Sequence, residues 1–128
     1  MKSVVISGSR RFASGMKKFA KELKALGVYV YEPIIFLDSD SWMKLEEKHQ
    51  QMIFRGLAND HFQKIRKADV MYVFNKGGYS GPSVTLEIGF AHALNKQIYA
   101  YSHDEEWGRD LLFEEVTRSA KKLYERLK

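Results

Sequence analysis

Short apolar runs alternate with segments of helical periodicity along this chain. The runs have the length of buried strands and occupy residues 3–7, 28–31, 70–74 and 98–101. Between the first two runs, apolar side chains recur at helical spacing up to Gly27, which can end a helix. A strand, a helix and a second strand in this order form a right-handed crossover between parallel strands. The alternation predicts a single domain over residues 1–128, a three-layer α/β fold of the Rossmann-like or flavodoxin-like kind. Its parallel sheet should have four or five strands.

The remaining segments supply the helices that would cover this sheet. A helix over residues 42–54 is expected after a group of polar residues that can cap it: Asp38, Ser39, Asp40 and Ser41. Gly56 is expected to interrupt this helix, and a second one should cover residues 59–67. Another helix follows the glycine-rich residues 75–83, with Asn95 as its left-handed C-cap. Apolar residues at helical intervals predict a last helix over residues 110–127.

Composition narrows the classes of function. The 128-residue chain is 45% hydrophobic and 29% charged, as is typical of a globular protein. It has no cysteine, which excludes disulfides, thiolate nucleophiles and cysteine-based zinc sites, and suits a reducing cytoplasm. The four histidines lack ligand spacing, so we expect no metal and no other cofactor. No apolar stretch approaches the roughly 18 residues of a membrane span, and we expect a cytoplasmic protein without membrane attachment.

The chain carries a formal net charge of +5 at pH 7, which attracts phosphates. Its basic residues are spread over several segments and interleaved with acidic ones, a pattern typical of a solvated surface. The net charge alone does not choose between nucleic acid and an anionic small molecule, but the scattered basic residues make nucleic-acid binding the least favoured function.

The loop after the first run could bind an anion. In parallel α/β sheets, ligands bind beyond the carboxyl ends of the strands. Gly8, Ser9 and Arg10 lie at such an end, just before the first helix, where backbone N–H groups and the helix dipole favour a phosphate. Arginine can add two hydrogen bonds to it. The same residues would also suit an ordinary strand-to-helix turn with an exposed arginine.

Residues 75–83 form a second candidate loop, after the third run. Gly78 and its neighbouring glycines allow a backbone to approach a ligand closely, and Pro82 suits the first position of a helix. Ser80 and Ser83 then lie near a helix N-terminus. They could bind a phosphate or a sugar hydroxyl, or could simply cap the helix.

Glu87 is the only carboxylate in the apolar helix that follows. A buried carboxylate costs several kcal/mol unless it is paired or hydrogen-bonded. Glu87 could interact with the helix dipole, or form an ion pair with Arg10 or Arg11. It could instead stabilise or attack an anomeric carbon beside a phosphate-binding loop. Gly89, in the middle of the same helix, predicts close packing against another backbone.

Three sequence features resemble the nucleoside 2-deoxyribosyltransferase superfamily, including its 2′-deoxynucleoside 5′-monophosphate N-glycosidase branch. These are Gly-Ser at residues 8–9, Ala-Asp-Val at residues 68–70, and Leu-Glu-Ile-Gly-Phe-Ala at residues 86–91 with Asn-Lys-Gln-Ile at residues 95–98. The similarity extends from the first strand to about Tyr101 and is that of a divergent offshoot. It implies hydrolysis or transfer at the N-glycosidic bond of a nucleotide or nucleoside.

The resemblance also implies roles for individual residues. Glu87 would be the nucleophile at the sugar C1′, and Tyr79 would orient it. Ser9 and Arg10, with Ser80 or Ser83, would bind a 5′-phosphate. Members of the superfamily are usually homo-oligomers, so the resemblance implies a homodimer or a higher homo-oligomer.

One position departs from the superfamily pattern. An aspartate typically lies eight residues before the position of Asp69 and assists protonation of the departing base, whereas this chain has His61 there, beside Asp60. A histidine can be a general acid, and a neighbouring carboxylate would raise its pKa. His61 could equally be structural. The alternative function is a non-catalytic nucleotide-binding or phosphate-binding regulatory module. Residues 102–107 are expected to form a surface loop that Trp107 packs down.

Overall fold

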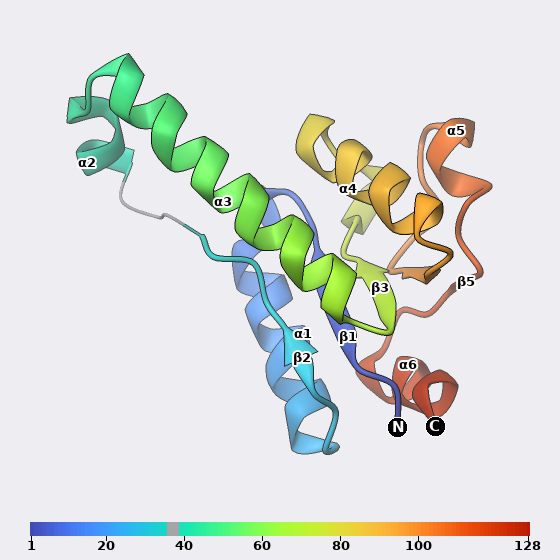
Figure 1. The fold of residues 1–128 in the computed structure, drawn as a ribbon. Coiled ribbons are helices and arrows are strands. Elements are labelled where there is room, and N and C mark those ends of the chain that lie inside the picture. Colours follow the sequence, from blue (N-terminus) through green and yellow to red (C-terminus); the bar gives the residue numbers. More distant parts are fainter. Residues whose placement is uncertain (36–38) are drawn as a thin grey trace.

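The computed structural model describes residues 1–35 and 39–128, which form a five-stranded sheet covered by helices on both faces (Figure 1). The strand order is β2-β1-β3-β4-β5, and all neighbouring strands are parallel. The strands are β1 (Val4–Ser7), β2 (Val30–Tyr31), β3 (Val70–Val73), β4 (Gln97–Ala100) and β5 (Glu115–Val116). The predicted fold class is confirmed, and the sheet has the larger of the two expected strand numbers.

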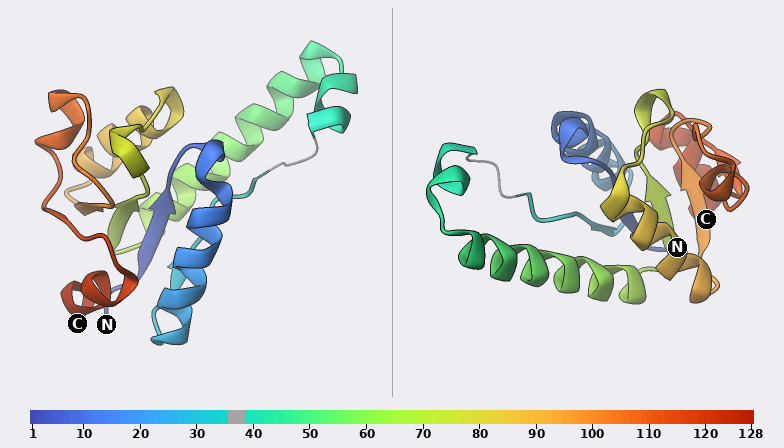
Figure 2. Two further views of the ribbon diagram at one scale, coloured as in Figure 1. Left: turned by 180° about the vertical axis from the view of Figure 1, so that it is seen from behind. Right: turned by 90° about the horizontal axis from the view of Figure 1, so that it is seen from above.

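Helices α1 and α6 cover one face of the sheet, and α3 and α4 cover the other (Figures 1 and 2). The helices are α1 (Ala13–Ala25), α2 (Ser39–Lys44), α3 (Glu47–Lys67), α4 (Pro82–Ala93), α5 (Trp107–Asp110) and α6 (Ala120–Leu127). Two short 3-10 helices, η1 (Arg10–Phe12) and η2 (Lys76–Gly78), follow β1 and β3. The chain ends lie close together, since the Lys2 N–H donates to the Leu127 carbonyl at 2.9 Å.

The central strands β1 and β3 are apolar along their length because both of their faces are buried. Alternate residues face opposite layers, so that Ile6 packs toward α1 and α6 while Val5 packs toward α3 and α4. On the first face, the Phe19 and Tyr72 rings stack with centroids 4.4 Å apart. The Tyr72 hydroxyl donates to the Thr117 carbonyl at 2.6 Å, which satisfies its polar atom inside the core.

Three of the expected helix boundaries are wrong. The helix expected over residues 42–54 is divided, because α2 already begins at Ser39 and ends at Lys44 and α3 begins at Glu47. Gly56 does not interrupt its helix, because α3 runs without a break from Glu47 to Lys67 and Gly56 is exposed on it. The expected helix over residues 110–127 is divided into α5, β5 and α6, since residues 115–116 pair with β4. The Ser119 side chain accepts from the Lys122 N–H and caps α6 at its actual start. Asp38, one of the expected caps, lies outside the described residues.

Two expected helix ends, at Gly27 and Asn95, are confirmed, whereas the close packing expected at Gly89 is wrong. Gly27 and Asn95 end α1 and α4 with φ of 88° and 59°, as a left-handed C-cap requires. Gly89, in contrast, is exposed in α4, and a Cβ built on it would meet nothing within 4 Å. It therefore packs against no backbone of this chain within the described residues.

Alanine substitutions at Gly8 and Gly89 should have opposite effects on stability. A Cβ at Gly8 would lie 2.6 Å from Met16 Sδ and 2.9 Å from the Phe74 carbonyl oxygen, so Gly8→Ala should destabilise the fold by about 1–3 kcal/mol. Gly89→Ala should stabilise it by up to about 1 kcal/mol, because it removes backbone entropy from the unfolded chain at an open helical position. Urea unfolding of both variants measures the difference. A stabilised Gly8→Ala protein would contradict the packing.

Candidate active site

Glu87 lies on α4 between two cavities at the carboxyl edge of the sheet. We call them the polar cavity, of about 210 Å³, and the apolar cavity, of about 200 Å³. Both are lined by Gly8, Arg10, Ser83 and Glu87. The loop after β1 and the first two turns of α4 thus meet around one carboxylate, as the sequence predicts for strand ends of a parallel sheet.

The polar cavity is formed by the loop after β1 and the N-terminus of α4. Its other lining residues are Ser9, Tyr79, Ser80, Gly81, Pro82 and Val84. Gly81 has a φ of 86° and precedes Pro82, which is at the first position of the helix as expected. The first N–H groups of α4 therefore border a cavity that also holds the Ser83 hydroxyl and the Arg10 guanidinium. These are groups that bind anions.

The apolar cavity lies on the other side of Glu87, toward α3. Its remaining lining residues are Pro33, Ile34, Ile35, Trp42, Phe54, Leu57, Ala58, His61, Phe62 and Leu86. Most of these come from α3 and from the segment after β2. Aromatic and aliphatic walls of this kind suit a flat, poorly hydrated ring.

A hydroxyl bridges Glu87 and His61 at the end of β1. The Ser7 Oγ lies 2.7 Å from His61 Nε2, and both residues are buried. His61 Nε2 also lies 3.6 Å from Glu87 Oε1. Ser7 hydrogen-bonds to the Glu87 carboxylate as well. Sequence reasoning missed Ser7, because a serine that ends an apolar run looks like the last residue of a strand.

Burial shifts the pKa values of Glu87 and His61 in opposite directions. It raises the pKa of Glu87 to about 7, against a smaller opposing effect of the Ser7 hydrogen bond. It lowers the pKa of His61 to about 4, helped by the charge of Lys64 and opposed by that of Asp60. Asp60 does raise the pKa of His61, as expected of a neighbouring carboxylate, but burial outweighs this effect and the net pKa is lowered. At neutral pH His61 is uncharged, so its approach to Glu87 is a polar contact and not an ion pair.

The other residues predicted to be catalytic lie beside this group. The Asp60 carboxylate pairs with Lys64 Nζ at 2.7 Å and does not line either cavity. The Tyr79 ring lines the polar cavity, and the Arg11 guanidinium lies 3.6 Å from its centroid. Arg11, which the sequence offered as one possible ion-pair partner of Glu87, thus contacts Tyr79 and forms no ion pair with Glu87 among the described residues.

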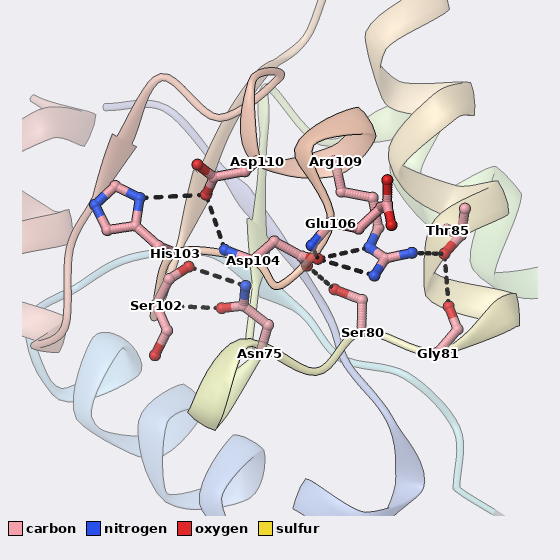
Figure 3. Close-up of polar contacts among 10 residues, drawn as sticks. All are labelled: Asn75, Ser80, Gly81, Thr85, Ser102, His103, Asp104, Glu106, Arg109 and Asp110. Carbon is pink, nitrogen blue, oxygen red and sulfur yellow. Dashed lines mark hydrogen bonds and ion pairs between the residues drawn. The ribbon is translucent and has the colours of Figure 1, made fainter.

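A buried polar network holds the loop before α4 in place (Figure 3). Asp104 is its centre, with a side chain that is 0% exposed. It accepts hydrogen bonds from the Ser80 hydroxyl at 2.5 Å and from Arg109 Nε at 2.9 Å. Arg109 Nη1 donates to Thr85 Oγ1 at 3.0 Å, and the Thr85 hydroxyl donates to the Gly81 carbonyl at 2.7 Å. The network connects residues 104–109 to the first turn of α4.

The same network changes the interpretation of the 75–83 loop and of residues 102–107. Gly78, with a φ of 87°, is covered by the backbone of residues 103–105, because a Cβ there would lie 3.1 Å from the His103 carbonyl oxygen. The Ser80 hydroxyl lies at the cavity wall but donates to Asp104. Trp107 does not pack the segment down, since it is 80% exposed. The buried Asp104 anchors the segment instead, and its acidic sequence surroundings gave no sign of this.

The described residues lack two features, a metal-binding cluster and a membrane-spanning helix. Within residues 1–35 and 39–128, no three or more side chains of His, Cys, Asp or Glu form a group that could hold a metal ion. Across the same residues, no helix has the length and apolar character needed to cross a membrane.

The fold and the site define a class of protein: a parallel α/β domain with a carboxylate beside a loop at the carboxyl edge of its sheet. The sequence model of the nucleoside 2-deoxyribosyltransferase family matches residues 8–117. The chain belongs to this family. A comparison with curated protein sequences finds no match.

Two solved structures have similar folds. A 2-deoxyribosyltransferase from the psychrotolerant bacterium Bacillus psychrosaccharolyticus superposes with a TM-score of 0.66 at 13% identity, over 94% of this chain and 89% of that one. A conserved protein from Enterococcus faecalis V583 gives a TM-score of 0.63 at 14% identity, over 99% of this chain and 97% of that one. At these identities the likeness supports the fold.

The stability difference between Glu87→Gln and the unchanged protein should grow with pH. The folded-state pKa of Glu87 is raised from 4.5 to about 7, so its favourable contribution is complete below about 4.5 and is lost as the pH rises through 7. A neutral glutamine avoids that loss. We expect the variant to gain up to roughly 3 kcal/mol over the unchanged protein between pH 5 and pH 8. Urea unfolding across this range measures it, and a difference that stays flat would contradict the burial of the carboxylate.

Removing Asp104 should be far more costly than removing its neighbour. Asp104→Ala leaves the Arg109 guanidinium, which is 16% exposed, without its carboxylate, and should destabilise the fold by about 3–5 kcal/mol. Glu105→Ala removes an exposed side chain and should change stability by no more than about 0.5 kcal/mol. Chemical denaturation of the two variants provides the comparison. Equal effects would show that Asp104 does not anchor the segment.

Proposed function

We propose that this protein cleaves or transfers the N-glycosidic bond of a nucleoside or nucleotide, with Glu87 as the nucleophile. The observation that carries the proposal is the position of Glu87 between a polar and an apolar cavity. A nucleoside also has a polar part and a flat apolar part, joined at C1′. Membership of the nucleoside 2-deoxyribosyltransferase family supports the same chemistry.

The substrate would lie across the two cavities. Its sugar, with a 5′-phosphate where one is present, occupies the polar cavity, where Ser9, Arg10 and Ser83 bind it. Its base occupies the apolar cavity, against Trp42, Phe54 and Phe62. This arrangement places C1′ next to Glu87. Gly8 leaves room for the sugar near the backbone, and Gly78 and Ser80 contribute by supporting the loop.

The reaction then proceeds in two displacements. A Glu87 carboxylate oxygen forms a bond to C1′ as the C1′–N bond breaks, and the electron pair of that bond leaves with the base, which takes up a proton from water. Water or a second base next attacks C1′ and releases Glu87, which gives hydrolysis or transfer. Tyr79 lines the cavity where it can orient the sugar or the carboxylate.

His61 and Ser7 would act mainly on Glu87. A neutral imidazole that is hydrogen-bonded to Ser7 can fix the position of that hydroxyl, and the hydroxyl in turn stabilises the ionised carboxylate. His61 also lines the base cavity, so it can hydrogen-bond to the departing base. Asp60, which pairs with Lys64, contributes through the electrostatic field around His61.

Purified protein should release free base from some 2′-deoxynucleoside 5′-monophosphate or nucleoside, and the reaction should depend on Glu87. Glu87→Gln and Glu87→Ala should each lower the rate by roughly 10³-fold or more, because the nucleophile is lost. The rate should rise with pH through about 7 as the carboxylate ionises. Chromatographic detection of the free base measures both effects.

A matched control separates chemistry from folding. Glu114→Gln neutralises an exposed carboxylate that lines neither cavity, and should leave the rate unchanged. Absence of base release over a full panel of nucleosides and monophosphates would contradict the proposal. Thermal stabilisation by nucleotides without turnover would then favour a non-catalytic nucleotide-binding module.

A further inference from the structure

A third cavity at the carboxyl edge of the sheet, separate from the polar and apolar cavities, is surrounded by basic side chains. It measures about 390 Å³ and lies on the α1 and α6 face, opposite the α3 and α4 face that packs around Glu87. Arg11 of η1, Lys18 of α1, Lys76 of η2 and Arg118 before α6 line it, together with a single carboxylate, Glu22. We call it the basic cavity. Its cations come from three stretches far apart in sequence, which the fold brings together: the continuous η1–α1 stretch, η2 and the residues before α6.

These charges are little compensated by the protein itself. Within the described part of the chain, Lys18, Lys76 and Arg118 form no ion pair with a carboxylate. The Arg118 guanidinium instead lies 5.7 Å from the centroid of the Tyr101 ring. Like charges around one concave surface repel one another and concentrate anions there. An anion with several negative charges would relieve this repulsion.

Aromatic rings form the inner wall of the basic cavity. Phe12, Phe74 and Tyr101 line it, with ring centroids 6.0 Å apart for Phe12 and Phe74 and 4.7 Å apart for Phe74 and Tyr101. Gly15 of α1 packs directly on Phe74, since a Cβ on it would lie 2.7 Å from Cζ of that ring. This contact fixes the position of the wall. Cations beside aromatic rings bind ligands that combine phosphates with a flat base.

We propose that the basic cavity binds a nucleoside diphosphate or triphosphate at a site separate from the Glu87 cavities. The phosphates lie among Lys18, Lys76 and Arg118, and the base lies against the aromatic wall. The volume suits one mononucleotide, and a single phosphate would leave much of the positive charge unpaired. Binding there requires no bond cleavage, so this inference does not depend on the proposed reaction.

The basic cavity shares a wall with the polar cavity. Arg11 lines the basic cavity and lies 3.6 Å from the ring centroid of Tyr79, which lines the polar cavity. A polyphosphate in the basic cavity attracts the Arg11 guanidinium and competes with its contact to Tyr79. Occupancy of one site therefore alters a wall of the other.

Calorimetric titration of the full chain with ADP tests the proposal. Lys18→Glu, Lys76→Glu and Arg118→Glu should each raise the Kd about tenfold or more, because each removes a charged contact and adds a repulsive one. Lys21→Glu reverses an exposed charge on the same helix outside the cavity, and should change the Kd little. Glu87→Gln should leave ADP binding intact. Adenosine and tripolyphosphate should both bind more weakly than ADP, since adenosine lacks the phosphates and tripolyphosphate lacks the base.

Several results would overturn this inference. They are a Kd that the three cavity substitutions do not change, tripolyphosphate binding as tightly as ADP, and binding of an oligonucleotide in the absence of ADP binding. Thermal unfolding of each variant verifies that it is folded, and Lys18→Gln provides a milder substitution where Lys18→Glu does not fold. Base release and ADP binding are measured separately, so failure of one leaves the other standing.

Discussion

The burial of one carboxylate at the sheet edge constrains everything around it. Glu87 is held largely out of water, which raises its pKa to about 7 and makes its ionised form costly. The protein reduces this cost with a hydroxyl, from Ser7, and places a neutral imidazole behind that hydroxyl. A strong cationic partner would keep the carboxylate ionised but would weaken it as a nucleophile. The observed surroundings leave Glu87 able to change charge near neutral pH, which is what the proposed reaction would require of it.

This arrangement requires accurate positioning of the segments that meet at Glu87. Ser7 is fixed because β1 is the strand between β2 and β3, and His61 is fixed because α3 packs on α4 and the sheet. The N-terminus of α4 packs on the sheet through Val84, and the Asp104 network holds it in addition, through Ser80, Arg109 and Thr85. A buried ion pair contributes little net stability but strongly disfavours other arrangements of the groups it joins. Here the Asp104–Arg109 ion pair orients the loop before α4, which lines the polar cavity.

Sequence reasoning succeeded where a single physical pattern decides the outcome. The strands of a doubly covered parallel sheet are continuous apolar runs, so β1 and β3 were predictable almost to the residue. Glu87 stood out because a lone carboxylate in an apolar helix demands an explanation. The break at Gly56 was wrong because one glycine in an exposed stretch of helix costs only about 1 kcal/mol, which does not end the helix. The strand β5 was missed because a two-residue strand has no detectable period.

The missed parts of the site depend on contacts between residues far apart in sequence. Ser7 and His61 are 54 positions apart, and Ser80 and Asp104 are 24 apart, so no local pattern connects either pair. Burial can also reverse the direction of the pKa shift that is expected from charged sequence neighbours. Asp60 beside His61 suggested a raised pKa, yet the loss of hydration outweighs that carboxylate and lowers it. Because desolvation is set by the whole fold, the charge state of a histidine in such a site follows from its packing more than from its sequence neighbours. Neutral at physiological pH, His61 would, in the proposed reaction, orient Ser7 and Glu87 and be a weak source of protons for a leaving base.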